Sequence, residues 1–349
     1  MLTSPTNAPP PYQYRCVDKS WLTGVLAATV VPQIERRLPL GMPANLITLL
    51  SSVCLGVMVL LQWLAPDWRA ALPTGIGLLV AYTLLDMVDG QRARRLGTSS
   101  PLGEYLDHTL DIFNAAVVVT VVFLVRPSGS PVALAWLLAA MGLAFAAALV
   151  EQRVGGVLRL GAIGPVEALL LVGCYLASRL VPGSDAWWEQ AAIGSWSRFE
   201  VAAAVAGAGI AFAATASVWR LRQVPWQLAM FAAGSLVFLA LLHEGAGTWG
   251  MLLALVFWSA DFGGRVIYSH LRHEPLPRPD AVGLGLALVL LGLALAGVRL
   301  SWLEFAPAAW LAGRFAWHVA VTIRGYRQYW AWWHRPARKD IAGDSLAPP

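Results

Sequence analysis

Long apolar segments recur along almost the whole chain of 349 residues and limit what it can fold into. Each runs for roughly 17–22 residues, enough for a helix to cross a hydrocarbon core of about 30 Å. In lipid, a segment of this kind satisfies its backbone polar groups internally by forming an α-helix. The pattern therefore predicts an all-α, polytopic integral membrane protein.

Composition supports this fold class. Hydrophobic residues make up 58% of the chain and charged residues only 13%, whereas soluble domains average about 45–50% and about 25%. These values exclude a disordered chain, a coiled coil and an ordinary cytosolic enzyme. We expect about ten transmembrane helices, preceded by an interfacial amphipathic helix. The expected spans are 45–64, 70–88, 108–126, 132–150, 163–181, 199–219, 227–243, 248–268, 281–298 and 303–323.

The segments divide the chain into five expected regions. Residues 1–17, rich in Pro and small polar residues, predict a flexible tail. Residues 18–44 mix apolar and charged positions, and Pro32 and Pro39 break any long span, which indicates a helix on the membrane surface. Residues 45–181 form the core that carries the acidic motif described below. Residues 182–323 add further spans, which could hold a lipid acceptor or a homodimer face, and 324–349 form a basic cytoplasmic tail.

The charge distribution predicts orientation. The formal net charge is +5, and basic residues such as Arg36, Arg95 and Arg220 gather on the side of the N-terminus, whereas few, such as Arg126, fall on the other. Cytoplasmic segments of membrane proteins carry such an excess, and anionic headgroups attract it. We therefore expect a cytoplasmic N-terminus and membrane lipids as partners. Nucleic acid is not needed to explain the basic charge.

The acidic residues gather in one window that runs from the second expected span into the third. Its pattern is Asp86-x₂-Asp89-Gly90-x₂-Ala93-Arg94-x₈-Gly103-x₃-Asp107-x₃-Asp111. On helices these spacings place each pair of carboxylates on one face, so two antiparallel helices can bring all four together. Acidic residues inside spans are costly and indicate a functional site.

Four clustered carboxylates repel one another unless cations neutralise them. Hard oxygen ligands suit Mg²⁺, Mn²⁺ or Ca²⁺, and two ions can share such a cluster. We expect a two-metal site that holds Mg²⁺ or Mn²⁺. Gly90, Ala93 and Gly103 leave room for a phosphate-bearing ligand, and Arg94, with Arg92 as a second candidate, can bind phosphate oxygens. The pattern predicts a site for a metal-bound diphosphate at the cytoplasmic interface.

This motif resembles the signature of the CDP-alcohol phosphotransferase family and matches it at every fixed position. The upstream segments YQYRCVDKSWLT and PANLITLL, and IGPVEALLL at 163–171, are similar to the choline/ethanolamine phosphotransferase branch. The resemblance implies transfer of phosphocholine or phosphoethanolamine from CDP-choline or CDP-ethanolamine to diacylglycerol, with release of CMP. It also implies that the four Asp residues hold the metals and that Asp111 is the favoured catalytic base.

The resemblance suggests further site residues and shows three departures. Asn45 is a candidate for the nucleotide pocket, with Thr48 beside it, and Glu151 and Glu167 are candidates for the acceptor site. The branch usually has Gly and Ser where this chain has Thr109 and Ile112, and a histidine where it has Val154. We expect these departures to affect acceptor handling, alcohol specificity or the level of activity.

Two alternatives remain. One is a CDP-diacylglycerol-dependent phosphatidyltransferase acting on a polyol or amino alcohol, and the other is a non-catalytic lipid transporter or scramblase. The near absence of lysine suggests a GC-rich bacterial genome, so the expected location is a bacterial inner or plasma membrane.

Overall fold

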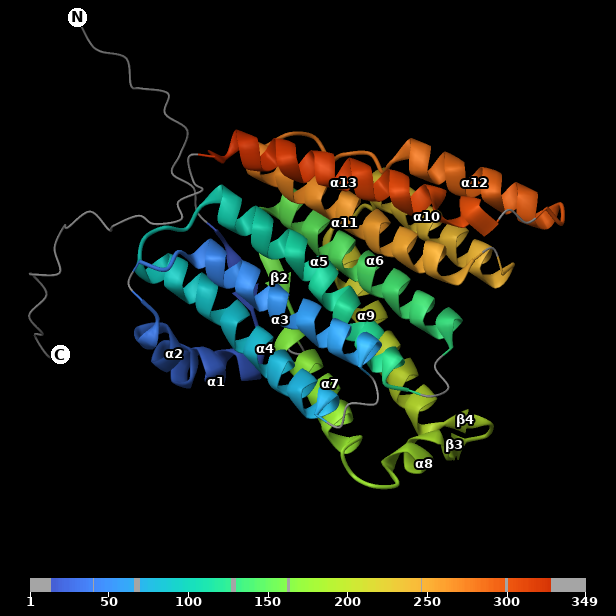
Figure 1. Ribbon diagram of the computed structural model, residues 1–349. Helices are drawn as coiled ribbons and strands as arrows, with labels where there is room; N and C mark the ends of the chain where they lie inside the picture. Colours follow the sequence, from blue (N-terminus) through green and yellow to red (C-terminus); the bar gives the residue numbers. More distant parts are fainter. Residues whose placement is uncertain are drawn as a thin grey trace, which may run out of the picture.

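The computed structural model describes residues 14–39, 41–65, 70–126, 130–161, 164–245, 247–298 and 301–327 (Figure 1). Of the two expected tails, 1–17 and 324–349, residues 1–13 and 328–349 lie outside the described residues. The helices are α1 (Trp21–Thr29), α2 (Val31–Arg37), α3 (Ala44–Leu64), α4 (Ala71–Arg95), α5 (Pro101–Leu124), α6 (Pro131–Gly155), α7 (Pro165–Ser178), α8 (Ser184–Glu189), α9 (Arg198–Arg220), α10 (Trp226–His243), α11 (Thr248–Arg272), α12 (Ala281–Leu295) and α13 (Ala306–Gly325), with a 3₁₀ turn at Ser301–Phe305. The strands are β1 (Cys16–Asp18), β2 (Leu158–Leu160), β3 (Ala191–Ile193) and β4 (Trp196–Ser197).

A helix occupies each of the ten expected spans, which confirms the fold class. Among the described residues, α3, α4, α5, α6, α9, α10 and α11 are long and apolar enough to cross a membrane. The helices α7 and α12 are apolar but shorter. The chain is thus a multi-pass integral membrane protein.

Helices α4 and α5 extend beyond the expected spans. Helix α4 continues to Arg95, and Arg92 and Arg95 of its last turn both pair with Glu35. Helix α5 begins at Pro101, seven residues before the expected span. Its N-cap Ser100 accepts a 3.1 Å hydrogen bond from the Gly103 amide, and proline at the first helical position favours this start. Both arms of the acidic motif are therefore helical.

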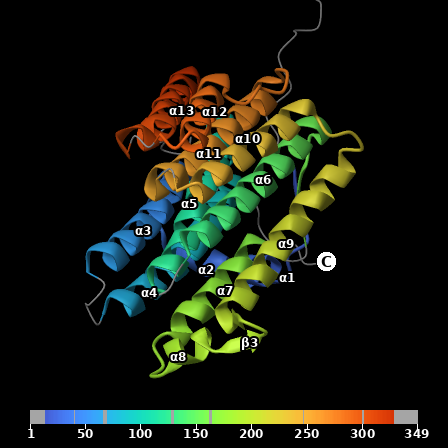
Figure 2. The same ribbon diagram turned by 90° about the vertical axis from the view of Figure 1, so that its right-hand side faces the viewer.

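The helices pack around two main apolar clusters. The larger joins α5, α6, α10, α11 and α13, and the smaller joins α3, α4, α5 and α7. Helix α11 is the most enclosed of the seven long apolar helices, because 78% of its most apolar 18-residue stretch is buried. In Figure 2, α9 lies at the outside of the bundle next to α6. Only 11% of its most apolar 18-residue stretch is buried. The homodimer face expected in this region stays a prediction.

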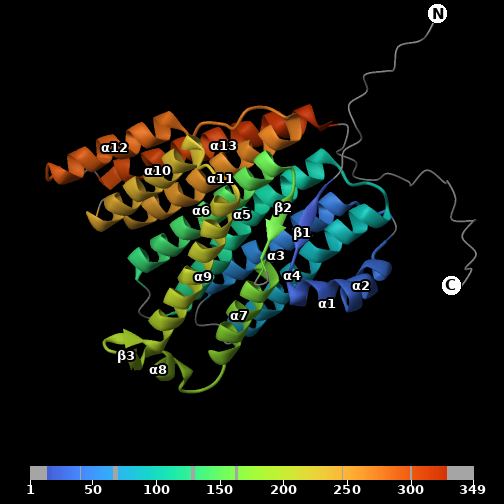
Figure 3. The same ribbon diagram turned by 180° about the vertical axis from the view of Figure 1, so that it is seen from behind.

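The segment before the first span folds differently from the single surface helix that we expected. It forms two short helices, α1 and α2, and Pro32 lies in the first turn of α2, where a missing amide proton is tolerated. Ahead of them, β1 pairs in parallel with β2, with Cys16 opposite Leu158 (Figure 3). Residues 16–18 are thus held against the chain that follows α6.

Candidate active site

The two arms of the acidic motif are helices joined by a short turn. Asp86 and Asp89 lie near the end of α4, and Asp107 and Asp111 lie in the first half of α5. The turn at residues 96–100 includes Gly97 with φ +63°, a conformation that glycine adopts without strain. This reversal places the two pairs of carboxylates side by side.

The four carboxylates form two overlapping groups. One ligand atom each from Asp86, Asp89 and Asp107 lies within 4.8 Å of the others, and the same holds for Asp107, His108 and Asp111. The side chains of Asp107 and Asp111 are 35% and 28% exposed, so the group is open on one side. Oxygen donors this close together suit hard divalent cations, and a donor shared between the two groups suits a pair of ions. The residues present therefore fit the expected Mg²⁺ or Mn²⁺.

Helix α3 supports this group from behind. The buried Thr48 hydroxyl donates a 2.5 Å hydrogen bond to Asp89 Oδ2. The residues that the sequence assigns to the donor also have close neighbours. A Cβ at Gly103 of α5 would lie 3.3 Å from Asn45 Oδ1, and one at Gly90 of α4 would lie 3.3 Å from an Arg94 nitrogen. Side chains at these two glycines would crowd the polar atoms beside the carboxylates.

Arg92 does not join this group, which corrects its expected role as a second phosphate ligand. Its guanidinium is fully buried and forms a 2.8 Å ion pair with Glu35 of α2. It also donates to the carbonyl oxygens of Pro39 and Met42. Because burial of an arginine requires such partners, Arg92 anchors the surface helix to α4, while the neighbouring Arg94 is exposed.

The two candidate acceptor residues make contacts that tie distant segments together. Glu151, at the end of α6, is buried and forms ion pairs with Arg220 at 2.6 Å and Arg159 at 3.3 Å. Glu167 accepts a 2.8 Å hydrogen bond from the Gly164 amide at the start of α7. Its other oxygen accepts a 2.5 Å hydrogen bond from the Ser20 hydroxyl, which fastens α1 to α7.

Two residues near the carboxylates did not emerge from the sequence as site candidates. His108 is buried, with Nδ1 3.7 Å from Asp107 and 4.0 Å from Asp111. Its position inside the motif is a signal that could have found it. The Tyr14 ring lies 5.6 Å from the His108 ring, and Tyr14 comes just before β1, which pairs with β2. Burial, with Cys16 and Asp107 nearby, raises the pKa of Tyr14 well above its usual value, so the phenol stays neutral.

A second imidazole approaches from α11. His270 Nε2 lies 3.9 Å from Glu104 Oε1, and Gln152 donates a 2.7 Å hydrogen bond to the same buried carboxylate. Val154, which replaces the histidine of the family pattern, is 59% exposed at the end of α6. In this chain the imidazole beside Glu104, in the first turn of α5, is that of His270 from α11.

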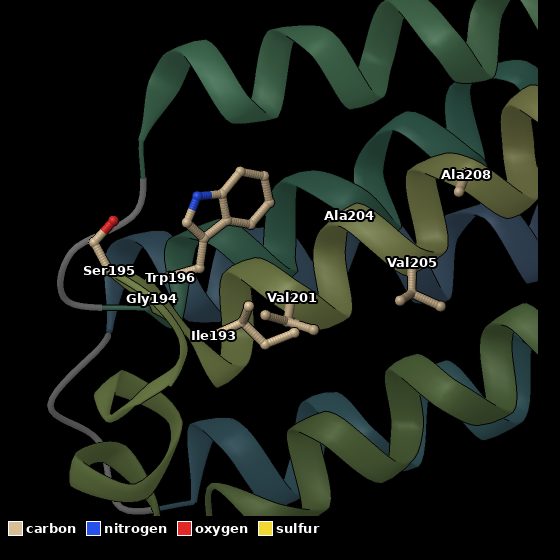
Figure 4. A pocket seen from close by; sticks show the side chains of 8 residues that line it. All are labelled: Ile193, Gly194, Ser195, Trp196, Val201, Ala204, Val205 and Ala208. Atoms are coloured by element: carbon tan, nitrogen blue, oxygen red, sulfur yellow. The ribbon is translucent and has the colours of Figure 1, made fainter.

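An open cavity of about 560 Å³ lies elsewhere, between the β3–β4 hairpin and α9 (Figure 4). Its walls include Ile193, Trp196, Val201 and Val205. Figure 1 places this hairpin at the opposite end of the bundle from the turn between α4 and α5. The lining is largely apolar, and no charged residue is among the residues that form it.

The fold and the acidic group define a class: a multi-pass helical membrane protein with a carboxylate site suited to divalent cations. Residues 42–193 match the sequence model of CDP-alcohol phosphatidyltransferase, and they form a domain of that family. This finding confirms the resemblance seen in the motif.

Relatives with assigned names point to the same branch. The chain is 30% identical over 186 residues to choline/ethanolaminephosphotransferase 2 of Arabidopsis thaliana, covering 51% of this chain and 47% of the relative. It is 30% identical over 195 residues to ethanolaminephosphotransferase 1 of Mus musculus, covering 51% and 48%. The chain thus spans about half the length of the curated relatives it matches.

Proposed function

We propose that the protein transfers phosphocholine or phosphoethanolamine from the corresponding CDP-alcohol to the hydroxyl of diacylglycerol, releasing CMP. The observation that carries this proposal is the convergence of Asp86, Asp89, Asp107 and Asp111 from two helices of the family domain. The names of the relatives, which are choline and ethanolamine phosphotransferases, support the choice of donor.

The four aspartates would hold two divalent ions, Mg²⁺ or Mn²⁺. When bound, such ions neutralise the diphosphate and favour in-line displacement at phosphorus. Thr48 keeps Asp89 in place through its hydrogen bond. Asp107 and Asp111, which are partly exposed, face the space that the donor enters.

The donor would lie over the small residues of the motif. Gly90, Ala93 and Gly103 leave space for the diphosphate, Arg94 would bind its oxygens, and Asn45 would line the nucleotide pocket. The exposed Arg94 beside Gly90 and the placement of Asn45 beside Gly103 support this arrangement. A guanidinium suits phosphate because it donates two parallel hydrogen bonds.

The reaction then needs a proton acceptor. The acceptor oxygen forms a bond to the alcohol-side phosphorus, the bond from that phosphorus to the CMP oxygen breaks, and Asp111 takes the hydroxyl proton. His108 Nδ1, 4.0 Å from Asp111, is close enough to influence the charge of this carboxylate but beyond hydrogen-bond distance. General base catalysis of this kind contributes about 10²–10⁴-fold.

The acceptor is a lipid, so the site must be reached from the membrane. We place it at the cytoplasmic face, as the basic segments around it favour. Glu151 and Glu167 would shape the acceptor side through the segments that they hold, since both carboxylates are already paired. The bacterial plasma membrane stays a prediction from composition.

A panel of donors tests the proposal. Purified protein in lipid nanodiscs with Mg²⁺ receives labelled CDP-choline or CDP-ethanolamine plus diacylglycerol, or CDP-diacylglycerol plus a panel of polyols and amino alcohols. We expect labelled phospholipid only with the first two donors. Product from CDP-diacylglycerol alone would support the alternative phosphatidyltransferase. If no donor gives product and the folded protein moves labelled lipid between leaflets, the result would support a transporter.

A further inference from the structure

Helix α11 packs directly behind the helix that carries two of the four aspartates. It lies outside the family domain at residues 42–193, yet it is the most enclosed of the long apolar helices. Where it meets α5 it has two consecutive glycines, Gly263 and Gly264, and both are buried.

Gly263 leaves no space for a side chain towards α5, whereas a Cβ at Gly264 would make only ordinary contacts. A Cβ at residue 263 would lie 2.4 Å from Cδ1 of Ile112, a separation that real Cβ atoms essentially never show. A Cβ at residue 264 would lie 3.5 Å from the Tyr105 hydroxyl and 3.7 Å from Cγ2 of Thr109. A methyl group at 263 must push Ile112 back from 2.4 Å to at least the 3.4 Å of ordinary contact.

The residues that contact the glycines alternate with the aspartates along α5. Ile112 and Thr109 are 3% and 4% exposed, whereas the side chains of Asp107 and Asp111 are open towards the site. One face of α5 thus packs on α11, and the adjacent face holds carboxylates. Because a packed helix moves as a unit, displacing the first face displaces the second.

The contact also accounts for two of the departures from the family pattern. Where the choline/ethanolamine branch usually has Gly and Ser, this chain has the larger Thr109 and Ile112. Ile112 lies next to Gly263 and Thr109 lies next to Gly264. The larger side chains on α5 therefore pack where α11 has no side chain. Neither departure therefore lies among the carboxylates.

We propose that Gly263 is a positioning residue: it sets how closely α5 approaches α11, and thereby where Asp107 and Asp111 stand relative to Asp86 and Asp89. This inference rests on the metal site of the proposed function. Metal–ligand distances tolerate only about 0.2 Å, and changes behind the ligands typically weaken metal binding about 10–100-fold. Relief of the contact requires a movement of 1.0 Å (3.4 minus 2.4 Å) at Ile112 Cδ1, and even a fraction of this passed on to α5 is large on this scale.

The test is a pair of variants, Gly263→Ala and Gly263→Ala/Ile112→Val. Valine lacks the Cδ1 atom that the new methyl would meet, and the Cγ1 position is 3.8 Å away, which is an ordinary contact. The readouts are Mn²⁺ affinity of the purified protein by electron paramagnetic resonance and melting temperature without metal. Gly285→Ala, at a position with nothing within 4 Å, is the matched control.

We expect Gly263→Ala to weaken Mn²⁺ binding at least about 10-fold and the double variant to restore most of it, because the repair removes the displacing contact. Wild-type Mn²⁺ affinity in Gly263→Ala, or loss that the double variant does not repair, would overturn the inference. If Gly263→Ala does not fold, Ile112→Ala takes its place: it loosens the same contact and should also weaken Mn²⁺ binding, and unchanged binding would overturn the inference.

The same experiment separates this inference from the proposed function. Wild-type protein that binds Mn²⁺ but transfers no headgroup would contradict the function and leave the comparison of variants valid. Wild-type protein that binds no Mn²⁺ would overturn both.

Discussion

The Thr48 hydroxyl of α3 donates a 2.5 Å hydrogen bond to Asp89 Oδ2 of α4, and both side chains are buried. This bond fixes one carboxylate of the acidic group from outside the motif. The same carboxylate belongs to a candidate metal group with Asp86 and Asp107.

Thr48→Val should weaken metal binding. Valine has nearly the shape of threonine but leaves a buried carboxylate oxygen without its donor, which costs about 1–3 kcal/mol. Substitutions behind metal ligands typically cost about 10–100-fold in affinity, and we expect a loss in that range for Mn²⁺. Thr48→Ser retains the hydroxyl and should bind Mn²⁺ almost as tightly as the wild type. Equal affinity in all three proteins would contradict the role of this bond.

Asp107→Asn and Asp111→Asn should each abolish measurable transfer. Each variant keeps the side-chain shape and removes one negative charge that a divalent cation needs. Without metal, both should melt at the same or a higher temperature than the wild type, because like charges in a cluster repel. The rise in melting temperature on adding Mn²⁺ should disappear. Asp185→Asn, on the distant α8 and with an exposed side chain, is the control, and retained transfer in Asp111→Asn would refute the assigned site.

Arg94→Ala should raise the KM for the CDP-alcohol by about 10-fold or more, because a charged hydrogen bond to phosphate contributes about 1.5–3 kcal/mol. Mn²⁺ affinity should not change, since Arg94 is exposed beside Gly90 and is not a ligand. Arg94→Lys keeps the charge but not the paired donors and should fall between the two. Steady-state kinetics at several donor concentrations measure the effect. An unchanged KM in Arg94→Ala would remove this residue from the donor site.

Arg92→Met should destabilise the protein far more than Arg95→Met, although both arginines pair with Glu35. Arg92 is fully buried, so its loss takes one of two partners from the buried Glu35 carboxylate and leaves the carbonyl oxygens of Pro39 and Met42 without this donor, at a cost of about 3–5 kcal/mol. Arg95 is 42% exposed, and an exposed pair contributes at most about 1 kcal/mol. Melting temperatures in detergent measure the difference. Similar melting temperatures for the two variants would show that α2 does not depend on the buried pair.

The sequence established the membrane fold and most of the acidic group because both are local patterns. Apolar segments of sufficient length become helices in lipid whatever surrounds them, and a helix occupies each of the ten expected ranges. Within the motif, spacings of three and four residues place the aspartates on one face of each helix. A short turn between the two helices then brings the two pairs of aspartates together, as in the structure.

Contacts between distant segments could not be predicted in this way. Nothing near Arg92 in the sequence indicates that Glu35 lies 2.8 Å away, and nothing in the tail indicates that β1 brings Tyr14 to His108. The contact of Gly263 with Ile112 also joins two helices far apart in the chain. Such pairs depend on which faces of the helices meet, and that is decided by the fit of side chains over the whole interior. The sequence alone determined the helices and the chemistry of the motif, and the tertiary structure decided which residues support it.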